Sequence, residues 1–239
     1  MDNKTLLKFS IVIPAHNEEK YIEETLKHLK EIGYPNDFYE VVVVENGSSD
    51  KTYEIAKKYE CENFKVFSID KKGVSVARNF GAKKIKENSD WLIFLDADTH
   101  LKKGFLDDLN DFLIKNSSKN YVVGTTSLLP QKNSLYAKFW FKFYDISHIL
   151  LHASLSIQIV RKDVFYKVWY DENLQYTEDW KMMKSAEKFG KFFFIWTNKV
   201  YTSTRRFDSV GYIKQLMLFI YWGILPERYK RKVNYEVIR

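Results

Sequence analysis

Residues 39–44 read Tyr-Glu-Val-Val-Val-Val, a short stretch with four valines in succession. An uninterrupted apolar run of this length is typical of a strand covered on both faces, as in a parallel sheet. Similar strands are predicted at residues 9–13, 63–69 and 91–95, and a helical pattern separates each from the next. This alternation predicts an open α/β sheet with right-handed crossovers.

The expected element boundaries follow from residues that cap helices or break strands. Pro14 is expected to end the first strand because it has no N–H for the ladder. Asn17 is expected to be the N-cap of the first helix, and Asp50 to open a helix that runs through Tyr59. A third helix is expected over 75–87. After Asp98, helices are expected at 106–114, 177–189 and 212–225, and strands at 121–126, 156–160 and 192–196.

The composition restricts the class of protein. Of the 239 residues, 45% are hydrophobic and 29% are charged, which excludes a disordered chain and a polytopic membrane protein. The net charge of +7 suits phosphate-bearing ligands or an anionic membrane surface, and no nucleic-acid partner is expected. Cys61 is the only cysteine, so neither an internal disulfide nor a cysteine-based zinc site can form. The first eight residues lack the apolar core of a signal peptide, and we expect a cytoplasmic protein.

Two carboxylates, Asp96 and Asp98, directly follow the predicted strand 91–95. Ligands of open α/β sheets bind at the carboxyl ends of the strands. Mg²⁺ or Mn²⁺ held by one or two carboxylates typically completes its coordination with substrate phosphates. The pair therefore indicates a site for a divalent cation and phosphate, although two loop aspartates that cap a turn would give the same pattern.

Other strands carry polar side chains to the same edge. The segments 13–19 and 45–52 follow the first and second strands, and residues 73–81 precede the third helix. This last segment lacks the glycines of the dinucleotide fingerprint, but its Arg78 can neutralise a phosphate. The alternative interpretation of these residues is that they are turn and N-cap residues, with Arg78 a solvated helix residue.

Taken together, these segments resemble the family 2 glycosyltransferases with a GT-A fold. The resemblance is carried, in the order of the family and over roughly residues 9–210, by segments 13–19, 45–52, 73–79, 96–98, 161–165 and 177–180. It implies a single Rossmann-like open mixed sheet, mostly parallel and flanked by helices, with a C-terminal aromatic and basic helical extension. The expected domain covers residues 1–210, with a nucleotide-sugar half (1–100) and an acceptor half (101–210), followed by a helical tail at 211–239.

The resemblance also assigns residues to the site. Asp179 is implied as the catalytic base, and Asp96 and Asp98 as the residues that bind metal and diphosphate. The nucleotide-sugar site is expected to contain Pro14, Ala15, Glu18, Glu45, Asn46, Ser48, Arg78, Asp96 and Ala97. Glu178 and Trp180 are also expected near the acceptor or a phosphate. Arg205 and Arg206, which precede the last apolar helix, can reach a diphosphate or a lipid phosphate, and a salt-bridged strand end is the alternative. The family more often has aspartate where this chain has Glu45, which leaves the nucleobase open.

The implied activity is inverting transfer of a sugar from a nucleoside-diphosphate sugar, with UDP favoured and GDP possible. The acceptor would be a hydroxyl or a lipid phosphate in the assembly of a cell-surface polysaccharide, glycolipid or protein-linked glycan. Mn²⁺ or Mg²⁺ would neutralise the leaving diphosphate, and a carboxylate would deprotonate the acceptor. Because Glu178 and Asp179 begin the expected helix, its dipole should keep Asp179 anionic. An acidic N-cap after Thr177 is the alternative.

Two other classes of protein remain open. Residues 94–99 also look like the opening motif of haloacid-dehalogenase-type phosphatases, but that motif usually lies on the first strand, and here three strands precede it. The second is a catalytically silent nucleotide-binding scaffold, which the intact aspartates argue against. His148 and His152 are four residues apart without the glutamate of the zincin pattern, so we interpret them as structural or acceptor-site residues.

The C-terminal part of the sequence raises the question of membrane contact. Residues 216–222 are apolar all round, and Arg228, Lys230, Arg231 and Lys232 follow. A spanning helix needs about 20 apolar residues, so this stretch is too short to cross a bilayer. It can pack in a core or lie in the membrane interface with its cations near lipid phosphates. We expect peripheral contact with the cytosolic membrane face through 212–232, and a glycan or polyprenyl-linked acceptor.

Overall fold

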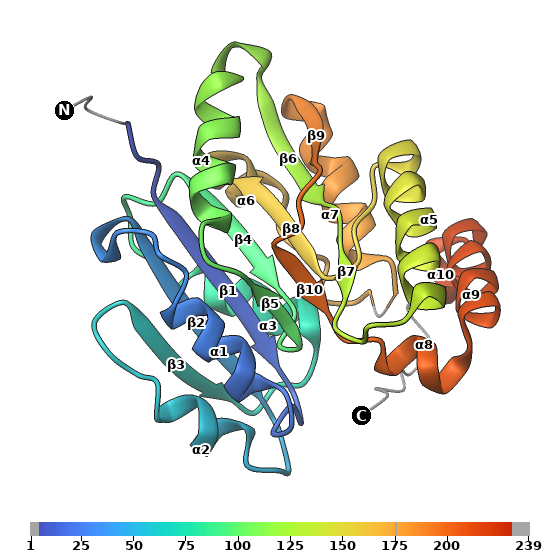
Figure 1. The fold of residues 1–239 in the computed structure, drawn as a ribbon, viewed down its shortest axis with the longest axis horizontal. Coiled ribbons are helices and arrows are strands. Elements are labelled where there is room, and N and C mark those ends of the chain that lie inside the picture. Colours follow the sequence, from blue (N-terminus) through green and yellow to red (C-terminus); the bar gives the residue numbers. More distant parts are fainter. Residues whose placement is uncertain (1–4, 175, 231–239) are drawn as a thin grey trace.

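The computed structural model describes residues 5–174 and 176–230 (Figure 1). Its strands are β1 (Phe9–Ala15), β2 (Tyr39–Asn46), β3 (Phe64–Ile69), β4 (Trp91–Leu95), β5 (Thr99–Leu101), β6 (Tyr121–Thr126), β7 (Leu129–Pro130), β8 (Ile157–Arg161), β9 (Lys191–Ile195) and β10 (Val200–Thr202). Its α-helices are α1 (Ile22–Lys30), α2 (Thr52–Lys57), α3 (Val74–Ala82), α4 (Phe105–Lys115), α5 (Leu135–Leu151), α6 (Lys162–Val168), α7 (Glu178–Ala186), α8 (Arg205–Val210), α9 (Tyr212–Ile224) and α10 (Glu227–Lys230).

A mixed sheet with the strand order β3-β2-β1-β4-β8-β6-β9 forms the centre of the molecule. β1 pairs in parallel with β2 and β4, and β2 with β3, as the apolar runs predict. β8 is antiparallel to both of its neighbours, β4 and β6, so it reverses direction inside an otherwise parallel sheet. A smaller sheet, β5-β10-β7, lies beside it. The expected mixed, mostly parallel α/β sheet is therefore confirmed.

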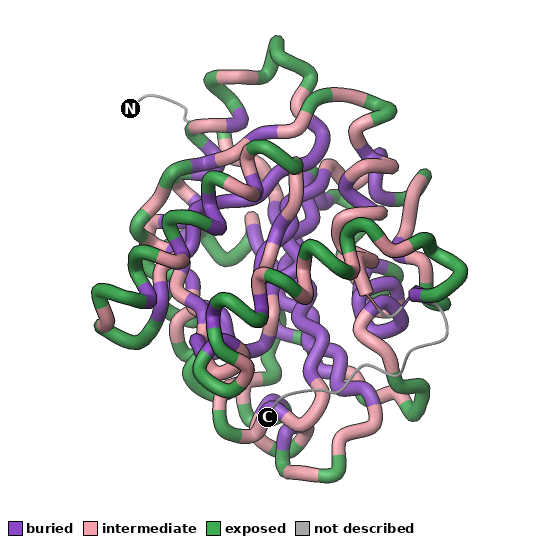
Figure 2. Tube along the Cα trace, turned by 90° about the vertical axis from the view of Figure 1, so that its right-hand side faces the viewer, coloured by how far each residue is buried: buried purple, intermediate pink, exposed green. Residues whose placement is uncertain are grey.

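Both faces of the large sheet are covered by helices, which explains the apolar strands. Ile11 and Ile13 of β1 share one core with α1 and α4, whereas Val12 lies in a second core with α3, α6 and α7. Successive residues of β1 thus enter opposite cores. The strands are buried along most of their length, and the exposed residues lie mainly on the outer sides of helices and on loops (Figure 2).

Two predicted boundaries near the first strand are wrong. β1 continues through Pro14 to Ala15, paired with β2. Its pairing with β4 ends at Val12, so the N–H that Pro14 lacks removes no hydrogen bond between β1 and β4. Asn17 is not a helix N-cap, since it has a φ of 54° and α1 begins at Ile22. Its side-chain oxygen instead accepts a hydrogen bond from Ser49 N at 2.7 Å, which ties the β1 loop to the β2 loop.

Other boundaries differ by a few residues. α2 ends at Lys57 instead of Tyr59, although Asp50 does accept a hydrogen bond from Thr52 N, at 3.0 Å, at its start. α3 ends at Ala82, five residues earlier than expected, and α7 covers 178–186. The aromatic-rich stretch is the 17-residue helix α5.

The helix α9 begins inside the main core. Tyr212 is buried and its ring stacks on Phe207 at a centroid distance of 5.1 Å, while Phe219 contacts Tyr144 of α5 edge-on at 5.8 Å. No helix of the described residues is long and apolar enough to cross a membrane. Of the basic residues expected to follow α9, Arg231 and Lys232 lie outside the described residues.

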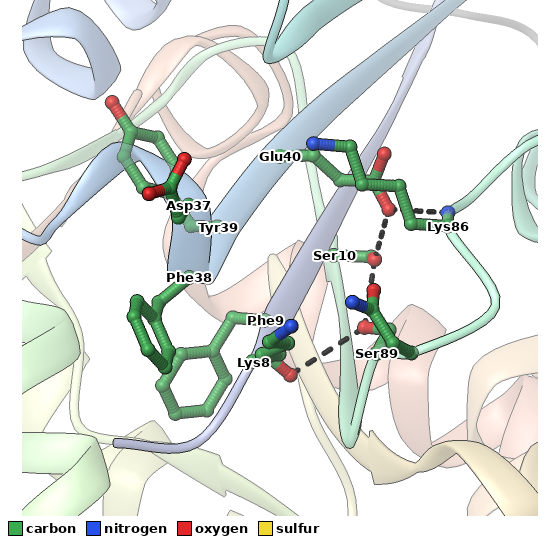
Figure 3. Close-up of a pocket in the computed structure, with 10 residues that line it drawn as sticks. Lys8, Phe9, Ser10, Asp37, Phe38, Tyr39, Glu40, Lys86 and Ser89 are labelled. Atoms are coloured by element: carbon green, nitrogen blue, oxygen red, sulfur yellow. Dashed lines mark hydrogen bonds between the residues drawn. The ribbon is translucent and has the colours of Figure 1, made fainter.

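The buried Glu40 at the amino end of β2 shows how a charged side chain is accommodated in this apolar strand. Its Oε1 accepts hydrogen bonds from Ser10 Oγ and from Lys86 N, both at 2.6 Å (Figure 3). The hollow around them has a volume of about 10 Å³, too small for more than a water molecule. Hydrogen bonds from a side chain and from the backbone therefore satisfy the buried Glu40 carboxylate.

Gly81 lets α3 pack directly on the sheet. A Cβ there would overlap Val12 Cγ1 and would lie 3.2 Å from Val44 Cγ2. We expect Gly81→Ala to lower the free energy of unfolding by about 1–3 kcal/mol in urea denaturation, because overpacking outweighs the gain in helix propensity.

Gly223→Ala is the matched control, since no atom lies within 4 Å of the added Cβ in α9. It should leave stability unchanged or raise it by up to about 1 kcal/mol. Equal stabilities for the two variants would contradict the close packing of α3.

Candidate functional site

The predicted site residues come together at the carboxyl ends of β1, β2 and β4. Asp96 and Asp98 follow β4, Glu18 follows β1, and Glu45 is the penultimate residue of β2. Because these strands are parallel, their carboxyl ends meet at one edge of the sheet. The starts of α7 and α8 approach the same edge, as the ion pairs described next require.

Arg78, a buried residue of α3, joins two of the predicted acidic residues. Its Nη2 lies 3.2 Å from Asp96 Oδ1 and its Nη1 lies 3.0 Å from Glu178 Oε1. Burial alone would lower the pKa of Arg78, but Tyr170, Asp96 and Glu178 outweigh it and raise the pKa overall. The guanidinium therefore stays charged and connects the loop after β4 to the start of α7.

Arg205, at the start of α8, forms a second bridge. Its Nη2 donates to Glu18 Oε1 at 2.6 Å, and its Nε lies 3.0 Å from Asp98 Oδ2. The guanidinium also lies 4.5 Å from the centre of the Tyr21 ring. Arg205 thus joins residues that are more than 100 positions away from it in the sequence.

Asp98 is a buried carboxyl group whose protonation is close to balanced at neutral pH. Burial raises its pKa to about 7 against the opposing effect of Arg205, while Asp96 and Glu18 add to the rise and the Arg206 charge lowers it. A divalent cation beside Asp98 would favour the ionised form.

Asp179 is the second residue of α7, and protein surrounds most of it. Its Oδ1 accepts a hydrogen bond from Trp180 N at 2.7 Å, and Ser154 Oγ lies 3.4 Å from Oδ2. Loss of solvent and the neighbouring Glu178 raise its pKa to about 7, against the effect of Arg78. The expectation that the helix start keeps Asp179 fully anionic is therefore wrong, because desolvation and a like charge outweigh the helix dipole.

The residues expected around the nucleoside already have partners within the protein. Both oxygens of the Glu45 carboxylate accept hydrogen bonds, one from Ser48 N and the other from Ser68 Oγ at 2.6 Å. With its amide oriented to satisfy both groups, Asn46 donates to Ala15 O at 2.9 Å and accepts from Gly73 N at 3.0 Å. These residues therefore brace the walls of the site.

The other predicted residues differ in their accessibility. Pro14, Ala15 and Ala97 are buried at the strand ends, and Ala97 O accepts a hydrogen bond from Thr25 Oγ1 at 2.7 Å. Trp180 turns toward the end of α5, where its Nε1 donates to Leu151 O at 3.2 Å. The site thus brings the acids and arginines together, while the small residues and Trp180 support its surroundings.

The donor set fits a divalent cation that shares its coordination with a ligand. Among residues 5–174 and 176–230, no three acidic, histidine or cysteine side chains converge into a complete metal site. Asp96 and Asp98 would therefore supply only part of the coordination of Mg²⁺ or Mn²⁺, as is usual when substrate phosphates provide the rest.

Unused donors beside the two aspartates suit such phosphates. Arg78 Nε, Arg205 Nη1 and Ser75 Oγ are buried and have no hydrogen-bond partner among the described residues. An unpaired buried donor is unfavourable unless a ligand or water accepts from it. A diphosphate would satisfy these groups with charge-assisted hydrogen bonds.

Sequence reasoning missed several contacts around the start of α7. Trp222 of α9 stacks on Tyr176 with the ring centres 4.1 Å apart, and Lys230 Nζ donates to Thr177 Oγ1 at 3.2 Å. Glu227 of α10 lies 2.7 Å from Lys181 Nζ. No local pattern in the sequence indicates that the C-terminal helices return to this loop.

The two histidines on α5 and at its end do not form a joint metal site. His148 is buried, and burial lowers its pKa to about 4, while His152 bonds to Glu187. Their separate surroundings favour the structural interpretation.

Comparison with known proteins agrees with this geometry. Residues 10–201 match the profile of glycosyl transferase family 2. The poly(ribitol-phosphate) β-N-acetylglucosaminyltransferase TarS of Staphylococcus aureus is 34% identical over 116 residues, which cover 47% of this chain but 20% of TarS. TarS is thus several times longer than the part that it shares with this chain.

Solved structures show the same fold. S. aureus TarS in complex with UDP-GlcNAc aligns with a TM-score of 0.69 at 23% identity, over 94% of this chain and 69% of that one. The mannosyltransferase PcManGT from Pyrobaculum calidifontis, in complex with GDP-Man and Mn²⁺, aligns with a TM-score of 0.63 at 16% identity, over 95% and 68%. The fold is that of the GT-A glycosyltransferases, and the match over most of its length shows that the chain belongs to glycosyl transferase family 2.

Proposed function

We propose that this chain is an inverting, cation-assisted glycosyltransferase that moves a sugar from a nucleoside-diphosphate sugar to an acceptor. The observation that carries the proposal is the pair of arginine bridges, which gather Asp96, Asp98 and the start of α7 at one edge of the sheet. UDP-sugars are the favoured donors because the TarS structure contains UDP-GlcNAc, and GDP-sugars are the second candidate because PcManGT contains GDP-Man.

In this proposal, the donor's diphosphate binds between the two arginines. Arg78 Nε, Arg205 Nη1 and Ser75 Oγ are the free donors that would contact its oxygens. Asp96 and Asp98 would hold Mn²⁺ or Mg²⁺, and the bound cation supplies neutralisation of the leaving diphosphate.

Asp179 would act as the base. Within the described part of the chain, its Oδ2 is held only by the long contact with Ser154, so this oxygen can accept the proton of an acceptor hydroxyl. A pKa of about 7 suits a general base at neutral pH. Attack by the deprotonated acceptor on the face of the sugar opposite the diphosphate would invert the anomeric centre in one displacement.

We expect Asp98→Asn to reduce sugar transfer by at least about 100-fold, since it removes charge where the cation and diphosphate meet. Release of nucleoside diphosphate from UDP- and GDP-sugars with Mn²⁺ measures the effect. Asp163→Asn is the matched control, because Asp163 pairs with Arg161 at the start of α6, close to the amino end of β4. Transfer by Asp98→Asn at the rate of the control would contradict the assignment.

Asp179→Asn should leave donor binding intact and lower turnover by about 10²–10⁴-fold, because it keeps the volume of the side chain and removes the base. In the unaltered enzyme, kcat at saturating donor and Mn²⁺, where the bound cation would keep Asp98 ionised, should rise as the pH increases through about 7, since the base must lose its proton before it can act. The rise should be absent in Asp179→Asn. Product with retained anomeric configuration, determined by NMR, would exclude this mechanism.

We further propose peripheral contact with the cytosolic membrane face, and therefore a lipid-linked acceptor. α5 and α9 lie side by side (Figure 1), and each carries an exposed apolar stripe at helical spacing. We call these stripes the α5–α9 apolar face; its members are Leu135, Phe139, Phe143, Ile146, Leu150, Ile213, Met217, Ile220 and Ile224. The side chains of Leu135 and Ile224 are 85% and 80% exposed. A cluster of large apolar side chains this exposed is unusual for a soluble surface and marks an interaction site.

The charges beside this face favour an anionic lipid surface. Lys138, Lys142 and Lys214 are exposed on the same two helices, and the one acidic residue of these helices, Asp145, is buried. Each cation near an anionic surface contributes about 1 kcal/mol, and apolar side chains in the interface supply the rest. A soluble glycan is the alternative acceptor.

The double variant Met217→Glu/Ile224→Glu should abolish co-sedimentation with anionic liposomes, because two charges would have to enter the interface. Both side chains are exposed, so the fold should be unaffected. Ile114→Glu, on α4, is the control and should pellet like the unaltered protein. If the unaltered protein pellets with neither anionic nor neutral liposomes, membrane contact is excluded and a soluble acceptor is favoured.

A further inference from the structure

The Arg205 bridge occupies one of the two Asp98 oxygen atoms that could bind a cation. Nε of Arg205 lies 3.0 Å from Asp98 Oδ2, and its Nη2 lies 2.6 Å from Glu18 Oε1. The side chains of Arg205 and Asp98 are only 19% and 11% exposed, so water screens this contact weakly. A cation at Asp98 and the guanidinium in its present position would be two like charges on one carboxylate.

We propose that Arg205 is a built-in competitor for the cation, which Asp98 releases only when a nucleoside diphosphate gives Arg205 a new partner. The inference rests on the proposed function and goes beyond it, because it assigns the order and coupling of ligand binding to one side chain. The cation alone should bind weakly, and the cation with the diphosphate should bind tightly.

Arg205 has an unused hydrogen-bond donor and a long side chain that can turn from Asp98 to a phosphate. Its Nη1 is buried without a hydrogen-bond partner among the described residues, so one donor is ready for a phosphate oxygen. The backbone around it is fixed, since Arg205 N donates to Ser203 Oγ at 3.2 Å and Thr204 Oγ1 donates to Asp208 Oδ2 at 2.7 Å. The exchange therefore requires the long side chain to turn, without unfolding of α8.

The other bridge does not compete in the same way. Arg78 holds Asp96 by Oδ1 at 3.2 Å and Glu178 at 3.0 Å, and among the described residues its ion pairs do not include Asp98. Arg78 can thus stay with Asp96 while a ligand approaches its free Nε. Of the two bridging arginines, Arg205 is therefore the one that would compete with a cation at Asp98.

This arrangement makes the binding of cation and diphosphate mutually dependent. Coupling between two sites is reciprocal, so Mn²⁺ should raise the affinity for UDP by the same factor as UDP raises the affinity for Mn²⁺. Typical coupling factors are about 5–150. Without Arg205, Glu18 and Asp98 lose the charge that bridges them, so Mn²⁺ alone should bind more tightly and the factor should fall toward one.

The test measures Mn²⁺ binding to the full chain from the electron paramagnetic resonance signal of free Mn²⁺, with and without UDP. We expect Arg205→Gln to bind Mn²⁺ alone at least about fivefold more tightly than the unaltered protein, with a smaller effect of UDP. Arg161→Gln removes the same charge at the amino end of β4, opposite Trp91, and should behave like the unaltered protein.

Arg205→Lys keeps the charge and should retain weak binding of Mn²⁺ alone, which separates the charge from any effect on folding. If Arg205→Gln does not fold, Arg205→Met, which keeps an apolar stem and removes the charge, takes its place: tighter binding of Mn²⁺ alone with a smaller effect of UDP would support the inference, and unchanged values would overturn it. For a folded Arg205→Gln, an unchanged Mn²⁺ affinity or an unchanged UDP effect overturns it.

The outcomes for the two proposals can be told apart. Normal binding of Mn²⁺ with UDP, but the same coupling in Arg205→Gln, would refute the competition and leave cation assistance standing. If no protein binds Mn²⁺ with or without UDP, cation assistance itself fails, and the competition fails with it.

Discussion

The site depends on two guanidinium groups, the buried Arg78 and the partly buried Arg205, that hold four carboxylates together. Arg78 binds Asp96 and Glu178, and Arg205 binds Glu18 and Asp98. Removal of one partner from a buried pair costs about 3–5 kcal/mol, so each bridge fixes the loops it joins. Burial is the main reason why the pKa of Asp98 is raised, and the neighbouring Asp96 and Glu18 add to the rise. A divalent cation beside these carboxylates would favour their ionised forms, as the proposed function requires.

Much of this arrangement follows from short-range sequence patterns. Four apolar runs predict four parallel strands, and parallel strands bring the residues after β1, β2 and β4 to one edge. The sequence alone thus predicts that Asp96, Asp98 and Arg78 lie at the same edge of the sheet. The sequence does not predict that Arg205 pairs with Glu18, since 187 residues separate them. It also does not predict that β8 lies antiparallel between β4 and β6, because its apolar residues resemble those of the parallel strands. The prediction that Asn17 caps a helix is wrong because an asparagine side chain can accept a hydrogen bond from a neighbouring loop as well as from the start of a helix.

The protonation of Asp179 illustrates a competition that sequence cannot decide. A helix start favours an anion by only about 0.3–1 kcal/mol at exposed positions, whereas loss of solvent and an adjacent carboxylate act in the opposite direction. Glu178 is next to it in the sequence, but the degree of burial depends on how the loop before α7 packs. The outcome, a pKa of about 7, places the group where a modest change in its surroundings alters its charge.

The C-terminal helices connect the two surfaces that matter for the proposed function. One side of α9 presents apolar stripe residues to solvent, while Trp222, near its end, stacks on Tyr176, three residues before Asp179. α10 adds two polar contacts to the same loop, through Glu227 to Lys181 and through Lys230 to Thr177. A helix that served only to attach the protein to a membrane would have no need of these contacts.

Because α9 packs against α5 on one side and the α7 loop at its end, a lipid surface on the α5–α9 apolar face would lie beside the segment that positions the base. The acceptor and the base would then reach the donor from the same side of the molecule.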